Sequence, residues 1–106
     1  MRILFDQGTP VPLRKLLNFH QVETSFERGW STLTNGELLA AAEQERFEVF
    51  VTTDRNLRDQ QNLGGLRIAI IMLSSTSWPR IEKAATAVKE AIDAALRASF
   101  KEVEIA

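Results

Sequence analysis

One run of residues, 67–73, constrains the fold more than any other feature, because residues 68–72 (IAIIM) are all apolar. A strand with one face in water alternates apolar and polar side chains, whereas a strand that is apolar on both faces must be covered on both sides. Such strands lie inside parallel sheets that carry helices on each face. The run therefore predicts an interior strand of an α/β domain.

Short β-type runs alternate with segments of helical periodicity along the rest of the chain. The expected strands are residues 2–5, 21–26, 48–52 and 67–73, with a last edge strand at Val103 and Ile105. The expected helices are residues 10–17, 35–46, 55–62 (closed by Gly64 and Gly65) and a long one from 79 to about 99. Helical crossovers between strands build a parallel sheet that is covered on both faces. The sequence thus predicts one three-layer α/β/α domain over residues 1–106, with a mostly parallel sheet of four to five strands.

The composition excludes several classes of protein and of site. The chain has no Cys and one His, His20, which excludes disulfides and a cysteine nucleophile and argues against zinc. No apolar run approaches the roughly 20 residues that span a bilayer, and the first residues do not resemble a signal peptide. We therefore expect a cytoplasmic protein without membrane contact. The net charge of −1 leaves no general basic surface, so any contact with nucleic acid must be local.

Three acidic residues stand where the expected fold would bring them together. Asp6 directly follows the first strand, Asp54 follows the third by two residues, and Glu37 opens the helix after the second. In parallel sheets, ligands bind beyond the carboxyl ends of the strands where the strand order reverses, which is between the first and third strands for the order 2-1-3-4. Carboxylates that converge there repel one another and favour a hard cation, Mg²⁺ or Mn²⁺. Such a cation suits phosphodiester hydrolysis, because it polarises a phosphoryl oxygen and acidifies a bound water.

Each of these acids also has a purely structural interpretation. Thr34 and Glu37 have the spacing of a capping box at a helix start. Asp54 could cap the short helix that follows it, and Asp6 could form an Asx-turn. The pattern of residues leaves both interpretations open.

Three segments, in this order, resemble a known family. Residues 3–10 (ILFDQGTP) resemble the LLDENLP opening of small bacterial PIN-like proteins, which are relatives of VapC-type toxins. Residues 34–42 (TNGELLAAA) resemble their SDEEILALA helix, and residues 51–57 (VTTDRNL) resemble their LVTRDKDF strand end. The resemblance covers the chain from its start to about residue 73.

The resemblance implies a PIN-like α/β/α fold with an endoribonuclease site that depends on Mg²⁺ or Mn²⁺. It implies that Asp6 and Asp54 bind the metal directly, and that Glu37 is a third ligand or positions the attacking water. It also implies an RNA substrate, a toxin–antitoxin pair in which a partner protein neutralises the nuclease, and a homodimer.

The chain departs from the family pattern at three positions. Gln7 replaces a Glu, Asn35 replaces an Asp, and Asn56 stands where a further acid is usual. An amide can offer a carbonyl oxygen to a cation but supplies no charge. These positions therefore argue against a second metal ion and against full activity.

Four residues near the expected site are candidates for contacts with substrate: Arg55, Asn56, Arg14 and Ser74. Arginine holds phosphate through charge-assisted hydrogen bonds, and a serine hydroxyl after the fourth strand could contact phosphate or a metal-bound water. For Arg14 the alternative is a solvated helix face, and for Ser74 it is helix capping.

Two other functions stay open. A domain that keeps the fold but has lost catalysis would be a binding module, which the amides at positions 35 and 56 favour. A receiver-like domain would accept a phosphoryl group on Asp54. Receivers usually pair two acids after the first strand, however, whereas Gln7 follows Asp6 here, and no Lys is evident after a fifth strand.

Overall fold

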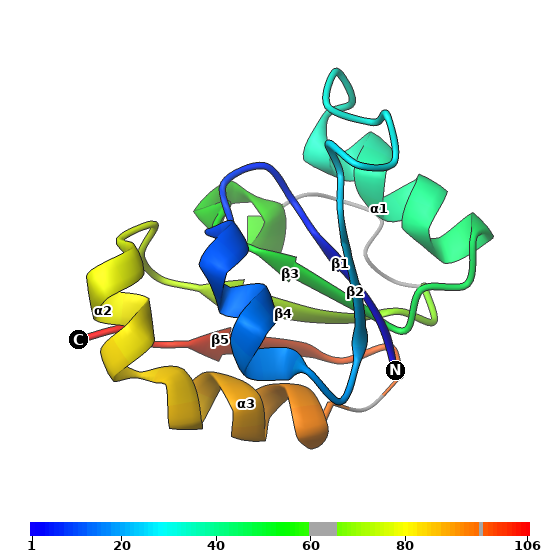
Figure 1. Cartoon of the computed structure of the whole chain (residues 1–106). Coiled ribbons are helices and arrows are strands. Elements are labelled where there is room, and N and C mark those ends of the chain that lie inside the picture. The colour runs from blue at the N-terminus through cyan, green and yellow to red at the C-terminus, as the bar shows by residue number, and fades with distance from the viewer. Residues whose placement is uncertain (60–65, 96) are drawn as a thin grey trace.

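The computed structural model describes residues 1–59, 66–95 and 97–106. Five strands form one sheet in the order β2-β1-β3-β4-β5, and every neighbouring pair is parallel (Figure 1). The strands are β1 (Arg2–Phe5), β2 (Gln21–Thr24), β3 (Val49–Thr52), β4 (Ala69–Leu73) and β5 (Phe100–Val103). This sheet confirms the predicted α/β class and the predicted number of strands.

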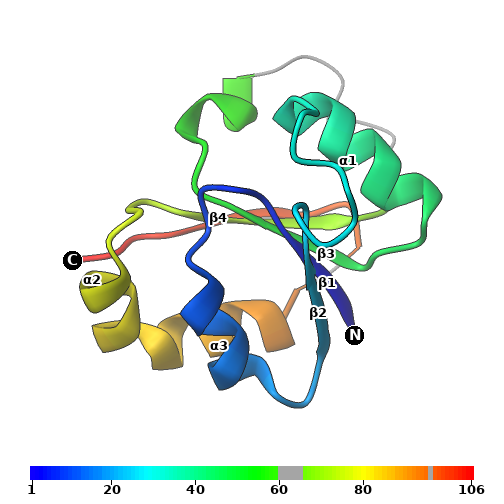
Figure 2. The same cartoon turned by 45° about the horizontal axis from the view of Figure 1, so that its top comes forward.

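Helices cover both faces of the sheet, as the three-layer prediction requires (Figure 2). One face carries η1 (Val11–Leu17), α2 (Trp78–Lys83) and α3 (Ala85–Asp93), and the other carries α1 (Asn35–Gln44) and η2 (Arg55–Asp59). β1 serves both layers, because successive side chains of a strand point to opposite faces. Ile3 and Phe5 pack in the core under η1, α2 and α3, while Leu4 packs in the core under α1 and η2.

β4 is the interior strand that the apolar run predicts. It pairs with β3 on one side and β5 on the other, and all five of its residues are buried. The two edge strands are β2, as its alternating pattern predicts, and β5. Because β4 is apolar on both faces, it is stable only between two other strands and under helices on both sides, which is its position between β3 and β5.

The chain after residue 77 forms two helices, which corrects the prediction of a single long helix to about residue 99. α2 and α3 meet at Ala84, whose φ of −97° and ψ of 15° lie outside the helical range. The bend lets Ile81 of α2 and Val88 of α3 bury completely in one core cluster. Periodicity could not reveal this bend, because the apolar stripe continues across it. The chain then turns at Ala98, with a φ of 63°, before β5 begins.

Other elements differ from prediction at their ends, since β2 ends at Thr24 instead of residue 26 and α1 at Gln44 instead of residue 46. The helix predicted for residues 55–62 is observed as η2 up to Asp59, and its remainder, with Gly64 and Gly65, lies outside the described residues. Val103 ends β5 as an edge strand, whereas Ile105 lies beyond it and donates its N–H to the Ser74 hydroxyl oxygen at 2.7 Å. No helix in the described part of the chain is long and apolar enough to cross a bilayer.

The strand order puts the reversal point between β1 and β3. β1 pairs with β2 on one side and with β3 on the other. The chain therefore adds β2 at one side of β1 and adds β3, β4 and β5 at the other side. The N–H of Asp6 donates to the carbonyl of Val51 at 3.1 Å, which extends the pairing of β1 with β3 by one residue. The crevice expected for ligands in this class of sheet therefore opens beside Asp6.

Candidate functional site

The carboxylate of Asp6 is buried at the carboxyl end of β1, with 4% of the residue exposed. Its Oδ1 accepts from the backbone N–H of Thr9 at 3.0 Å and from the Thr9 hydroxyl at 2.7 Å. Its Oδ2 accepts from the Thr52 hydroxyl at 2.6 Å. A buried carboxylate requires donors of this kind, because burial without them is strongly unfavourable. Together they fix the direction in which the carboxylate points.

Asp54 faces Asp6 across the side-chain amide of Asn35, the first residue of α1. The Nδ2 of Asn35 donates to Asp54 Oδ2 at 2.9 Å and to Asp6 Oδ2 at 3.4 Å. One amide group can make both bonds, because it carries two protons. Carboxylate oxygens from the ends of two adjacent strands therefore point toward a single atom.

Thr52, the last residue of β3, connects the two acids a second time. Its hydroxyl oxygen accepts the backbone N–H of Asp54 at 3.0 Å while its proton goes to Asp6 Oδ2. The residue is completely buried, so its hydroxyl has no access to water. The positions of Asp6 and Asp54 are thus coupled through one hydroxyl and one amide.

A hollow of about 360 Å³ opens over this pair of acids. Its lining consists of Asp6, Gln7, Gly8, Leu33, Asn35, Leu38, Thr53 and Asp54. A Cβ atom at Gly8 would overlap the hydroxyl oxygen of Thr53, so a larger residue at this position would force that side chain to move. Gln7 donates its side-chain amide to the carbonyl of Ser31 at 3.0 Å and so ties the loop after β1 to the loop before α1.

The carboxylate of Glu37 turns back to the start of its own helix. Glu37 Oε1 accepts the backbone N–H of Thr34 at 2.8 Å, and the Thr34 hydroxyl oxygen accepts the N–H of Glu37 at 3.2 Å, which is the capping box that the sequence predicts. Two hydrogen bonds lower the pKa of Glu37: the larger cause is the bond with the backbone of Thr34, and the smaller one is the bond with its side chain. The structure thus brings two of the three predicted acids into one network, while Glu37 caps α1.

Asp6 and Asp54 also make the turn and helix-cap hydrogen bonds that their structural interpretations predict. Asp54 Oδ1 accepts the N–H of Asn56 at 2.9 Å, at the start of η2, and Asp6 Oδ1 accepts the N–H of Thr9. Each acid uses Oδ1 for its own loop and directs Oδ2 toward Asn35. The local role of each acid therefore leaves its Oδ2 facing the hollow, where Asp54 Oδ2 accepts from Asn35 and Asp6 Oδ2 accepts from both Asn35 and Thr52.

The remaining candidates for substrate contact are divided between two places. Arg55 donates to the carbonyl of Ser74 at 2.6 Å, and both line a hollow of about 700 Å³ that shares Thr53 with the acid hollow. Arg14 instead forms an exposed ion pair with Glu27 at 2.5 Å. The hydrogen bond from Arg14 is the main cause that lowers the pKa of Glu27. Arg14 is thus engaged at the surface, as the solvated-face alternative expects.

The donor set suits a small hard cation with few protein ligands. Mg²⁺ is commonly held by one or two carboxylates, and water completes its coordination. Asp6 and Asp54 supply two carboxylate oxygens, and Asn35 can offer its carbonyl oxygen in place of its NH₂, because rotation of the amide exchanges the two. No group of three His, Cys, Asp or Glu side chains that could hold a metal occurs among the described residues. The residues fit one cation held by two acids and an amide.

Sequence reasoning missed two residues of this network, Thr9 and Thr52. Both are buried and donate their hydroxyl protons to Asp6. A signal was present for Thr52, since it is the one polar residue of β3 and closes an otherwise apolar strand. Thr9 carried no comparable signal, because a threonine between glycine and proline is ordinary in a turn.

Comparison of the chain with protein-family models, with curated proteins and with solved structures finds no match. The functional argument therefore rests on the site itself and on the resemblance of the three sequence segments.

Proposed function

We propose that this chain is a Mg²⁺- or Mn²⁺-dependent endoribonuclease of the PIN-like type, and the toxin of a toxin–antitoxin pair. The observation that carries the proposal is the meeting of Asp6 Oδ2 and Asp54 Oδ2 at the Nδ2 of Asn35, at 3.4 Å and 2.9 Å. It occurs at the reversal point of a parallel sheet, where this architecture binds its ligands.

The side chains have distinct roles in this proposal. Asp6 is the rigid ligand, because three donors on two residues hold its carboxylate in place. Asp54 is the partly exposed ligand on the side of the substrate. A bound divalent ion would polarise the scissile phosphoryl group and acidify a water molecule, so no side chain needs to act as a general base.

The adjoining hollow gives the substrate a polar path past the acids. Arg55, Arg80 and the hydroxyl residues Ser75 and Thr76 line it, and it meets the acid hollow at Thr53. Guanidinium and hydroxyl groups hold phosphate oxygens without reading the bases. Contacts of this kind fit a single RNA strand whose backbone lies across the carboxyl ends of β3 and β4.

The test is cleavage of an end-labelled single-stranded RNA in the presence of Mn²⁺. Loss of an outer-shell partner of a metal ligand typically costs 10–100-fold, so Asp6→Asn and Asp54→Asn should each reduce the rate by more than about a hundredfold. Asp93→Asn is the matched control, because this carboxylate is exposed on α3 and contacts only His20 among the described residues. Its rate should equal that of the wild type.

Three results would change the assignment. Cleavage that survives both Asp6→Asn and Asp54→Asn would identify a contaminating nuclease and leave the chain as a binding module. An absence of cleavage with Mn²⁺ would also leave the chain as a binding module. Full activity of Glu37→Gln would assign Glu37 to the helix cap alone, whereas a loss comparable to that of Asp6→Asn would make it a metal ligand or a residue that positions water.

The antitoxin and the homodimer enter this proposal through the family resemblance. A protein encoded beside this chain that acts as its antitoxin should abolish RNA cleavage on co-expression and give a complex of constant stoichiometry on size-exclusion chromatography. A chain that is toxic alone and harmless when co-expressed supports the pair. A chain that is harmless in both cases contradicts it.

A receiver-like phosphoacceptor is the second candidate, and the strand order favours it. The order β2-β1-β3-β4-β5 is one of the two common orders of doubly wound sheets and occurs in receiver domains, where the acceptor Asp follows the third strand. Asp54 has this position, but Glu104 follows β5 where receivers carry Lys. Incubation with acetyl phosphate distinguishes the two functions, since only a receiver would gain a phosphoryl group that Asp54→Asn removes.

A further inference from the structure

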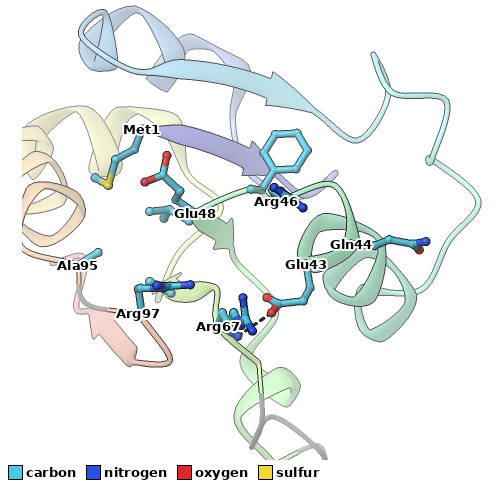
Figure 3. A pocket seen from close by; sticks show the side chains of 11 residues that line it. Met1, Glu43, Gln44, Arg46, Glu48, Arg67, Ala95 and Arg97 are labelled. Carbon is cyan, nitrogen blue, oxygen red and sulfur yellow. Dashed lines mark hydrogen bonds between the residues drawn. The ribbon is translucent and has the colours of Figure 1, made fainter.

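A larger hollow, of about 790 Å³, lies at the opposite end of the sheet, where β3, β4 and β5 begin (Figure 3). Its lining consists of Met1, Glu43, Gln44, Arg46, Phe47, Glu48, Val49, Arg67, Ala69, Ala95 and Arg97. The hollow shares no lining residue with the acid hollow. Any ligand that it binds is therefore independent of the proposed nuclease site.

Three arginines surround this hollow, and each comes shortly before one of three adjacent strands. Arg46 precedes β3, Arg67 precedes β4 and Arg97 precedes β5. Backbone hydrogen bonds hold these lead-in segments side by side, with the N–H of Ala98 donating to the carbonyl of Arg67 at 2.9 Å. Figure 3 shows the side chain of Arg97 extending toward Arg67. The parallel sheet thus gathers three cations that are far apart in the sequence.

The three guanidinium groups make no hydrogen bond or ion pair with the described residues. Glu43 and Glu48 line the same hollow but are used by the backbone instead. The two oxygens of Glu43 accept the N–H groups of Arg67 and Ile68 at 2.9 Å and 3.0 Å, and Glu48 Oε1 accepts the N–H of Arg2 at 3.0 Å. These glutamates hold the walls of the hollow and leave its cations unpaired.

Three other arginines of the chain behave differently. Arg2 and Arg28 bond glutamates and cover the ring of Phe47, while Arg14 pairs with Glu27. These three arginines therefore form ion pairs with glutamates whose carboxylates lie within reach. The exposed fork of an unpaired arginine is suited to a ligand oxygen anion, to which it can make two parallel hydrogen bonds.

Arg46 also occupies a backbone position that disfavours an arginine. The N–H of Arg46 bonds the carbonyl of Glu43 and the N–H of Phe47 bonds that of Ala42, which is the pattern of a Schellman motif at the end of α1. Arg46 therefore adopts a φ of 64°, where glycine is usual. An unfavourable backbone conformation at a residue whose cation lines a hollow suggests that the side chain has a function there.

We propose that this hollow binds a nucleotide, with its phosphates on Arg46, Arg67 and Arg97. The three guanidinium groups outnumber the two carboxylates of the lining, Glu43 and Glu48, so the hollow has an excess of positive charge that favours phosphate. The half-buried apolar side chains of Met1 and Ala95 also line the hollow, and they fit the rest of an organic ligand better than a bare inorganic ion. The size lies in the range of small-molecule sites, and the second oxygen of Glu48 can accept a sugar hydroxyl or a base amino group.

The test is calorimetric titration of the full chain with ADP, with pyrophosphate and with adenosine, in a buffer without divalent ions, so that Asp6 and Asp54 do not bind metal–nucleotide complexes. ADP should bind more tightly than either fragment. Arg67→Gln and Arg97→Gln should each weaken ADP by about tenfold or more, the usual size of a lost charged hydrogen bond. Lys89→Gln is the matched control, because Lys89 is an exposed cation on α3 that lines none of the three hollows, and it should change the affinity less than about twofold.

Three outcomes would overturn the proposal. An absence of ADP binding at millimolar concentration would remove the site. Binding that Arg80→Gln weakens and Arg67→Gln does not would move the ligand to the other end of the sheet. Equal affinities for ADP and pyrophosphate would reduce the hollow to an anion site without nucleotide recognition. Circular dichroism of each variant separates loss of binding from loss of fold.

Discussion

The two ends of the sheet hold their charged side chains in opposite ways. At the carboxyl end, Asp6 is buried and both of its oxygens accept hydrogen bonds from neighbouring loops. At the amino end, Arg46, Arg67 and Arg97 are exposed and make no contact of this kind with the described residues. A charge at the carboxyl end therefore holds the fold together, while three cations at the amino end take no such part among the described residues.

This difference has a physical origin in the environment of each group. A buried charge must be satisfied by the protein, so its geometry is fixed whether or not a ligand is present. An exposed charge is satisfied by water and can exchange that water for a ligand without disturbing the fold. Substitutions at the carboxyl end should therefore change stability and activity together. Substitutions of the arginines at the amino end should change ligand binding and leave stability nearly unchanged.

The largest effect on stability is expected for Asp6→Ala. The substitution leaves the buried Thr52 hydroxyl without its acceptor. It also leaves Thr9 only two longer bonds, from its N–H to the backbone carbonyl of residue 6 at 3.3 Å and from its hydroxyl to the Val51 carbonyl at 3.1 Å, and each loss is unfavourable. We expect the free energy of unfolding to fall by about 3 kcal/mol or more, measured by urea denaturation. Arg67→Gln is the comparison at the other end, and it should stay within about 0.5 kcal/mol of the wild type. Equal losses for the two variants would contradict the contrast between the ends.

The next effect is expected for Asn35→Asp, which replaces the bridging amide by a third carboxylate. Without metal, the new charge faces Asp6 and Asp54 and should lower the free energy of unfolding by about 2 kcal/mol, since three like charges then share one hollow. Mn²⁺ should restore the loss and raise the unfolding midpoint more than it does for the wild type. Asn35→Ala is the control, because it removes the amide and adds no charge. An equal response of all three proteins to Mn²⁺ would show that the acids do not form a cation site.

The strands and the meeting of two acids follow from local sequence features. The apolar run in β4 specifies an interior strand, and a parallel sheet then brings the residues after β1 and β3 to one edge. Asp6 and Asp54 follow these two strands directly and by two residues, so topology alone predicts their proximity. Short-range patterns succeed here because the positions involved are fixed by the backbone of the sheet.

Side-chain direction and long-range partners could not be predicted in the same way. Glu37 stands at the correct end of the sheet, but the choice between the hollow and the N–H of Thr34 depends on one rotamer. The break at Ala84 depends on the packing of two helices across η1, which no period in the sequence encodes. The three arginines before β3, β4 and β5 could not be predicted to line one hollow, because they are far apart in the sequence and form no motif.

A smaller effect is expected for Thr34→Ala, which tests whether Glu37 belongs to the carboxyl-end site. Loss of the capping hydroxyl should lower the free energy of unfolding by about 1 kcal/mol at neutral pH. The pKa of Glu37 is lowered in the folded chain, so the carboxylate contributes stability above its ordinary value of 4.5 and loses it as the pH falls through the folded value. The difference between wild type and variant should therefore shrink in acid, measured by urea denaturation across this range. RNA cleavage at neutral pH should be unchanged if Glu37 serves the cap alone, and a loss of cleavage would return it to the metal site.

The smallest effect is expected for Arg46→Gly, and it has the opposite sign. A left-handed backbone costs an L-residue about 1–2 kcal/mol, part of which glycine gives back as greater freedom of the unfolded chain. The free energy of unfolding should therefore rise by about 0.5 kcal/mol. The same substitution removes one of the three cations of the amino-end hollow, so ADP should bind more weakly to a more stable protein. Arg46→Lys, which keeps the charge and the strained backbone but loses the guanidinium fork, should retain part of the binding and none of the added stability. A glycine variant that gains stability and keeps full affinity for ADP would show that Arg46 has no share in the ligand site, and that the strain at this position has another cause.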